Sequence, residues 1–141
     1  MTAAAEVVAG LLVKLGVSRV TVRRDEPGPS AFPVVEEALA TGAGSLRDET
    51  TVHLPTQPVV LEVQAGRQVV QNDCRRASDD PAFQAMLETY GGLAAQIVTP
   101  VVVNGRLEAI LSVHQLGRPR VWTVAEIETA STAAARLGRL L

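Results

Sequence analysis

Residues 97–115 read IVTPVVVNGRLEAILSVHQ, and this stretch decides the fold. Asn104-Gly105 separates two apolar runs within it. The Asn-Gly dipeptide favours a two-residue type I′ turn, because both central positions of that turn need a positive φ. The stretch therefore predicts a β-hairpin that joins two long antiparallel strands.

A two-residue loop also fixes the register of the hairpin and the face on which each side chain lies. The pairs that we expect are Val103 with Arg106, Thr99 with Ile110, Val98 with Leu111 and Ile97 with Ser112. Alternation then predicts a core face made of Val98, Pro100, Val102, Leu107, Ala109, Leu111 and Val113. The opposite, mixed face carries Ile97, Thr99, Val101, Glu108, Ile110, Ser112 and His114. Because Pro100 cannot donate to a neighbouring strand, we expect a bulge or an unpaired side there.

Both ends of the chain predict helices. Residues 3–15 carry a broad apolar face, and Gly16 is placed to end that helix. Near the other end, Thr123 and Glu126 have the spacing of a capping box. The apolar stripe that we expect on the second helix consists of Val124, Ile127, Ala130, Ser131, Ala134, Leu137 and Leu141.

The middle of the chain alternates short strands and short helices. Residues 17–23 have the period of a strand. Residues 32–39 could form a strand or a helix, and the β-branched Val34-Val35 favours the strand. Residues 58–65 are ambiguous, and we interpret them as a helix opened by Pro58. The other expectations are a turn at 25–30, a loop over 40–56, a strand over 68–71 and a helix from Asp80-Pro81 to Gly91-Gly92.

Two hairpins without a clear β-α-β pattern predict an α+β fold, in which helices pack on an antiparallel sheet. No linker divides residues 1–141, so we expect one domain. Apolar residues make up 47% of the chain, and the formal net charge is -2. A nucleic-acid partner is not expected, because no basic stripe is present. No run approaches the ~20 apolar residues of a membrane span, and no leader pattern opens the chain, so we expect a cytoplasmic protein.

The stretch from Gly66 to Glu126 resembles the second half of a GAF domain. The matching segments are GRQVVQND (66–73), DP (80–81), YGG (90–92), IVTPVVVNG (97–105), RLEAILSVH (106–114) and RVWTVAEI (120–127). The first half of the chain agrees with that family in the order of its elements. The resemblance implies an antiparallel sheet with the N- and C-terminal helices on one face. On the other face it implies a ligand pocket covered by loops and short helices.

The resemblance also implies partners and limits the choice of ligand. The terminal helices of this family often pair with a second copy, and we expect Leu12 and Leu137 at such an interface. Bilin-binding relatives carry a Cys-His pair where this chain has Phe83-Gln84, so covalent bilin attachment is not expected. The single cysteine argues against a free methionine sulfoxide reductase, and the residue set of the cyclic-nucleotide branch is absent. The resemblance therefore identifies no cofactor.

Two strand faces supply most of the candidate ligand-binding residues. His114 could bond to a ligand or bind a haem iron; the alternative is a partly buried histidine bonded to its neighbours. Arg19, Thr21 and Arg23 share a strand face and could hold a carboxylate or phosphate; the alternative is a solvated face. If this face adjoins His114, an acidic ligand is expected. The full candidate set is His114, Ser112, Thr99, Ile110, Arg19, Thr21, Arg23 and Tyr90.

Cys74 is the one potentially reactive thiol of the chain. Arg75 and Arg76 follow it, and nearby positive charge can lower the pKa of a thiol. An unreactive loop cysteine is the alternative interpretation.

Three functions remain open from the sequence. The first is a regulatory domain that senses a small organic molecule and acts through a partner or its own dimer. The second is a dimerisation or scaffold module whose pocket is filled by its own side chains. The third is an enzyme, which would need His114 beside a carboxylate in a cleft; the sequence carries no catalytic motif for it.

Overall fold

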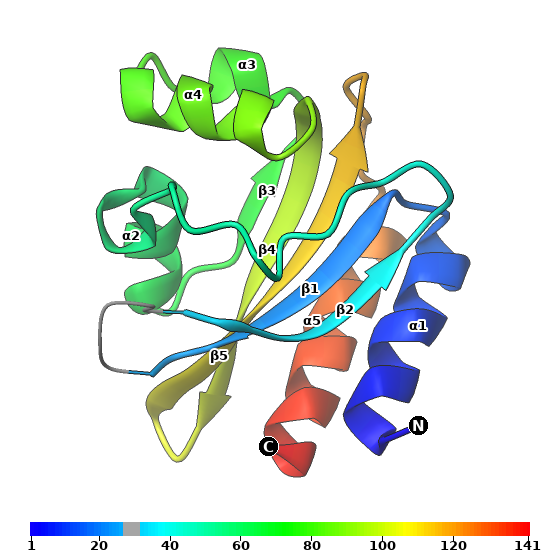
Figure 1. Ribbon diagram of the computed structural model, residues 1–141. Helices are drawn as coiled ribbons and strands as arrows, with labels where there is room; N and C mark the ends of the chain where they lie inside the picture. Colours follow the sequence, from blue (N-terminus) through cyan, green and yellow to red (C-terminus); the bar gives the residue numbers. More distant parts are fainter. Residues whose placement is uncertain (27–31) are drawn as a thin grey trace.

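The computed structural model describes residues 1–26 and 32–141, which form a five-stranded antiparallel sheet with helices on both faces (Figure 1). The strand order is β2-β1-β5-β4-β3. The strands are β1 (Arg19–Arg24), β2 (Val34–Leu39), β3 (Val69–Gln71), β4 (Leu93–Val103) and β5 (Arg106–Leu116). The helices are α1 (Ala3–Leu15), η1 (Leu54–Thr56), α2 (Pro58–Gln64), α3 (Cys74–Ala77), α4 (Pro81–Thr89) and α5 (Val124–Leu140). Most of the turn expected at 25–30 lies outside the described residues.

Local signals in the sequence set the helix ends. Gly16 ends α1 in the left-handed conformation, with φ 61°. The Asp80 side chain accepts from two backbone N–H groups at the start of α4. Both bonds of the Thr123 and Glu126 capping box are present at the start of α5. The helix expected at Pro58 and the strand expected within 32–39 are also confirmed.

A bulge in the central hairpin corrects the expected register. The turn itself is as expected, with positive φ at Asn104 and Gly105 and with Val103 opposite Arg106. Between Val101 and Val102 the register shifts, and Glu108 is left without a partner residue. From Val101 back to Ala95 every pair is displaced by one residue, and a second irregularity between Leu93 and Ala95 restores the original offset. The observed pairs are Val101 with Ala109, Pro100 with Ile110, Thr99 with Leu111, Val98 with Ser112 and Ile97 with Val113.

The one-residue displacement exchanges the two faces of β4 relative to β5, because side chains alternate along a strand. Ala109, Leu111 and Val113 lie in the core under the terminal helices, as expected. Ile97 and Val101 join them there, whereas Val98 lies in the second core with Ile110. The expected face assignment was thus correct for this part of β5 and wrong for β4.

Two separate cores fill the two sides of the sheet. The first lies between the sheet and helices α1 and α5, which run side by side (Figure 1). The second lies between the other face and the short helices α2, α3 and α4. On α5 the buried residues are Ala130, Ala134 and Leu137, whereas Val124 is 72% exposed and was wrongly expected in the buried stripe. In the described part of the chain, no helix is long and apolar enough to cross a membrane.

Candidate functional site

The hydrogen-bonded pairing of β1 with β5 brings most of the candidate residues together. Arg19 lies opposite His114, Thr21 opposite Ser112 and Arg23 opposite Ile110. These six side chains face away from α1 and α5, since the alternating Val20 and Val22 lie in the first core. Tyr90, at the C-terminal end of α4, packs its ring against His114 on this side of the sheet. The arginines and the histidine are therefore neighbours, as the acidic-ligand hypothesis requires.

Arg19 is a buried cation, 1% exposed, and all of its partners are neutral acceptors. Its Nε donates to His114 Nδ1 at 3.0 Å, Nη1 to the Gly44 carbonyl at 3.0 Å and Nη2 to the Tyr90 carbonyl at 2.8 Å. Burial lowers the pKa of Arg19 to about 10, against a raising contribution from Glu37. The guanidinium stays charged at neutral pH and ties β1, the 40–48 loop and the end of α4 together.

His114 is held as a neutral imidazole with a defined tautomer. Because Nδ1 accepts from Arg19, the ring proton is on Nε2. Burial lowers the pKa of His114 well below 6.5, and the charges of Arg19 and Arg23 lower it further. The Tyr90 ring stacks on the imidazole with centroids 6.0 Å apart. The site thus presents one imidazole N–H as a hydrogen-bond donor.

Arg23 is the second buried cation of the site, 7% exposed. Its Nη1 donates to the Phe32 carbonyl at 2.9 Å and its Nη2 to the Tyr90 hydroxyl at 3.3 Å. Among the described residues, neither Arg19 nor Arg23 forms an ion pair with a carboxylate. The charge of Glu49 acts on Arg23 from a longer distance, without a direct ion pair. An anion in hydrogen-bond contact with the buried Arg23 would therefore still be stabilised.

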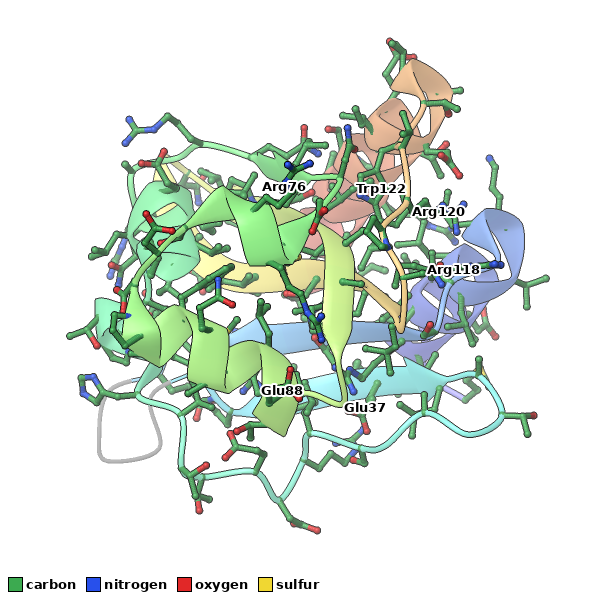
Figure 2. All side chains as sticks on the ribbon, turned by 90° about the horizontal axis from the view of Figure 1, so that it is seen from above. Glu37, Arg76, Glu88, Arg118, Arg120 and Trp122 are labelled. Carbon is green, nitrogen blue, oxygen red and sulfur yellow. The ribbon has the colours of Figure 1, made fainter. Side chains whose placement is uncertain are left out.

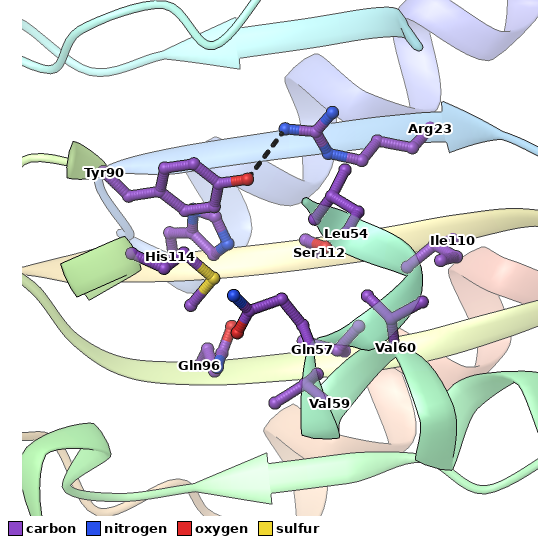
Figure 3. A pocket seen from close by; sticks show the side chains of 12 residues that line it. Arg23, Leu54, Gln57, Val59, Val60, Tyr90, Gln96, Ile110, Ser112 and His114 are labelled. Atoms are coloured by element: carbon purple, nitrogen blue, oxygen red, sulfur yellow. Dashed lines mark hydrogen bonds between the residues drawn. The ribbon is translucent and has the colours of Figure 1, made fainter. Parts of the chain in front are cut away.

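A cavity of about 40 Å³ lies beside these groups (Figure 3). One ordered water needs roughly 10–15 Å³ of such a volume, so the cavity has room for about two or three water molecules. Of the candidate residues, Arg23, Tyr90, Ile110, Ser112 and His114 line it. Arg19 lies behind His114 and positions it. Val59, Val60, Met86 and Val98 make the remaining wall mostly apolar.

Besides Arg19, two further candidate residues, Thr99 and Thr21, do not line this cavity. Thr99 lies on the sheet face that α1 and α5 cover, because the bulge exchanges the faces of β4. Gln68 donates to its hydroxyl at 3.0 Å and to Ser131 on α5 at the same distance. The Thr21 hydroxyl is buried and has no hydrogen-bond partner among the described residues. The expectation of Thr99 in the pocket was therefore wrong.

The cavity also contains two glutamines that sequence reasoning missed. Gln57, just before α2, is 4% exposed and turns its amide into the cavity (Figure 3). Its Nε2 makes a long bond of 3.4 Å to the Ala82 carbonyl, and its Oε1 has no partner in the described part of the chain. Gln96 donates to Gln71 Oε1 at 2.8 Å. Once the bulge is known, strand alternation places Gln96 on the same face as Val98, which would have indicated its position at the cavity. Gln57 follows a loop, and no local sequence signal indicates its position.

Cys74 is a core residue and does not lie in a polar loop. It opens the short helix α3 and is fully buried. Burial raises the pKa of its thiol to about 12, and the charge of Asp73 adds to the effect. Arg75 instead pairs with Glu88 at 3.5 Å on the surface. The hypothesis of a thiol activated by its arginine neighbours was wrong.

The buried histidine predicts a specific pH dependence of stability. Since the pKa of His114 is depressed in the folded protein, only the unfolded chain takes up this proton just below pH 6.5. The free energy of unfolding should fall by about 1.4 kcal/mol per pH unit there, or about 2 kcal/mol at pH 5. Urea unfolding between pH 7.5 and pH 5 measures this dependence on pH. In His114→Gln the free energy of unfolding should change less over the same range. The same slope in His114→Gln, or its loss in the exposed control His53→Gln, would contradict the assignment.

Comparisons with known proteins agree with this fold. The GAF domain family model matches residues 2–141, and the chain belongs to the GAF family. No curated protein matches the chain.

Solved GAF domains of cyanobacterial photoreceptors share the fold. The photoproduct state of GAF3 from Slr1393 of Synechocystis sp. PCC6803 has a TM-score of 0.81 and 22% identity, over 96% of this chain and 88% of that one. The blue-light absorbing form of the Thermosynechococcus elongatus PixJ GAF domain has a TM-score of 0.76 and 27% identity, over 96% and 83%. A far-red absorbing dark state with bound biliverdin has a TM-score of 0.77 and 19% identity, over 94% and 83%.

Proposed function

We propose that residues 1–141 form a single regulatory domain that senses a small organic carboxylate and acts through a partner or its own dimer. One observation carries the proposal: Arg23, buried and without an ion-paired carboxylate among the described residues, lines one cavity together with His114 and Gln57. A second buried arginine, Arg19, lies behind His114 and bonds to it. Similarity in fold to a protein with bound biliverdin, a small organic molecule, supports a ligand-binding function.

The donors and acceptors of the cavity match a carboxylate at one end of the ligand. Arg23 uses two of its five N–H groups on protein acceptors, which leaves donors for an anion. The His114 Nε2–H group supplies a neutral donor nearby, and Gln57 Oε1 supplies an unpaired acceptor. Hydrogen bonds between a guanidinium and a carboxylate are stronger than those between neutral groups, more so away from water. The carboxylate would therefore be the anchor of the ligand.

The apolar wall and the small volume restrict the rest of the ligand. A tetrapyrrole is far larger than a cavity of about 40 Å³. Phe83, at the position where the resemblance places the bilin-attaching pair, is fully buried in the second core. We therefore propose a compact aliphatic or aromatic acid in place of a bilin.

Hydrogen bonds and one cation-π contact connect the cavity to both terminal helices. Gln96 lines the cavity and bonds to the Gln71 side chain at 2.8 Å. The Gln71 carbonyl accepts from Trp122 Nε1 at 3.1 Å. The guanidinium of Arg120 lies over the Trp122 ring, 4.6 Å from its centroid.

Arg120 completes this connection because it bonds to the facing ends of both helices. It donates to the Leu15 carbonyl at 2.7 Å, at the C-terminus of α1, and pairs with Glu126 in the first turn of α5. Figure 2 shows Arg120 and Trp122 together at this end of the molecule. A ligand that moved Gln96 would bias this contact, and through it the relative position of α1 and α5.

The test is binding of a simple acid with and without Arg23. Titration calorimetry with benzoate should show an affinity about 10 to 100 times lower in Arg23→Met, because a charge-assisted hydrogen bond contributes about 1.5–3 kcal/mol. Arg24→Met is the matched control, since Arg24 is half exposed on the next position of β1 and pairs with Glu108. Equal benzoate affinity in both variants would refute the anchor.

A scaffold function is the second candidate, because the observed cavity is small. Phe32, Phe83, Met86 and Tyr90 are all buried in the second core, which is the arrangement expected of a filled pocket. An open groove between α1 and α5, lined by Gly10, Thr129 and Ala133 among others, offers a surface for a second copy. A dimer in sedimentation without any response to organic acids would favour this function. The enzyme hypothesis gains no support, since His114 bonds to Arg19 and not to a carboxylate.

A further inference from the structure

A second cavity lies against the first and shares two residues of its wall. It has a volume of about 230 Å³. Phe32, Val34, Leu46 and Val52 give it apolar walls, and Arg47 and Glu49 lie at its polar side. Arg23 and Leu54 line both this outer cavity and the inner cavity beside His114. The two spaces are therefore separated by these two side chains.

Arg23 is bonded to the walls of both cavities. Its Nη1 donates to the carbonyl of Phe32, which lines the outer cavity. Its Nη2 donates to the hydroxyl of Tyr90, which lines the inner cavity. An anion held by Arg23 at this boundary could thus carry a body that extends into either space.

Leu54 is the apolar part of the boundary. It is the first residue of η1 and is half-buried against the second core. Figure 3 shows its side chain beside Arg23 and Ser112, at the edge of the inner cavity. A leucine side chain makes no hydrogen bond and carries no charge, so Leu54 contributes to the separation only by its bulk.

We propose that the inner and outer cavities are two chambers of one ligand site, and that Leu54 determines the length of the ligand. With Leu54 in place the site takes a compact acid, with its carboxylate on Arg23. An elongated aryl or alkyl carboxylate, whose apolar body would reach from the inner chamber to Phe32, Leu46 and Val52, fits only when the side chain at position 54 is smaller. This inference rests on the carboxylate-sensing function proposed above. It adds a size limit set by Leu54 and not by the polar groups.

The first measurement detects the partition without any carboxylate. Crystals of the full chain under xenon pressure should show separate xenon positions in the wild type and continuous density between the chambers in Leu54→Ala. Leu54→Val is a milder variant should Leu54→Ala fold poorly, and it should show partial joining. Val52→Ala, which enlarges only the outer chamber, is the matched control and should keep the two positions separate. Separate positions in both Leu54 variants would overturn the proposal.

The second measurement compares two acids of different length by titration calorimetry. Leu54→Ala should bind biphenyl-4-carboxylate at least about 10-fold more tightly than the wild type, while the affinity for benzoate changes less than about 3-fold, because each buried CH₂ equivalent contributes to transfer from water. Benzoate binding with no gain for the longer acid would overturn the partition. Joined xenon density with no binding of either acid would support the partition and refute the carboxylate-sensing function.

Discussion

Leu137→Asp unfolds the protein, which is the largest effect that we expect from one substitution. Leu137 is 0% exposed and lies in the core between α5 and the sheet. Losing a buried leucine side chain costs about 2–5 kcal/mol, and an unpaired buried carboxylate adds to this. The total approaches the whole stability of a typical domain, about 5–15 kcal/mol. Far-ultraviolet circular dichroism and urea titration measure the loss.

Leu140→Asp is the matched control on the same helix. Leu140 is 42% exposed, so its replacement should change the free energy of unfolding by about 1 kcal/mol or less. A folded Leu137→Asp protein that is merely monomeric would contradict the assignment of Leu137 to the core. That result would restore the interface role that the sequence predicted for it.

The position of Leu137 also changes how a homodimer has to be tested. Leu12 is half-buried against the same core, so substituting Leu12 and Leu137 together reports folding and not association. A dimer through the terminal helices has to use their outward residues. Gly10 and Thr129 line the open groove between α1 and α5 and are the appropriate positions for interface variants.

Phe83→Ala is the second large effect, with an expected loss of about 3–5 kcal/mol in the free energy of unfolding. Phe83 projects from α4 into the second core, where it is 0% exposed. Removing the ring leaves an apolar cavity that the surrounding side chains fill only in part. Chemical unfolding of the variant and the wild type measures the difference.

Benzene provides the control for this variant, since an apolar cavity of ring size binds benzene. Benzene should raise the melting temperature of Phe83→Ala and leave that of the wild type unchanged. Phe83→Leu, which retains most of the volume, should lose less than the alanine variant. An alanine variant as stable as the wild type would contradict the assignment of the Phe83 ring to the second core.

Much of the fold could be predicted because its signals are local. Gly16, Asp80 and the Thr123–Glu126 capping box act on backbone groups within a few residues, and each has the expected role in the structure. Asn104-Gly105 sets its own turn for the same reason. The predicted register failed at the bulge at Glu108, because the extra residue of a bulge shifts all the pairs beyond it and has no turn or capping signal of its own.

The candidate site was predicted in part, and its two failures have different structural causes. Arg19, Arg23 and His114 were each recognised from the alternation of their own strand. Thr99 was misplaced, because the bulge moves it to the sheet face that α1 and α5 cover. Gln57 was missed, because its place in the cavity depends on where α2 packs on the sheet.

The sequence by itself determined the hairpin turn, the helix ends and the strand faces that lie within an unbroken register. These features follow from turn chemistry, capping and alternation, which operate over a few residues. Only the tertiary structure decided that Arg19 bonds to a histidine 95 positions away, that Cys74 is buried and that the cavity is small. Each depends on which distant segments pack together, and therefore on burial and desolvation that no short stretch of sequence contains.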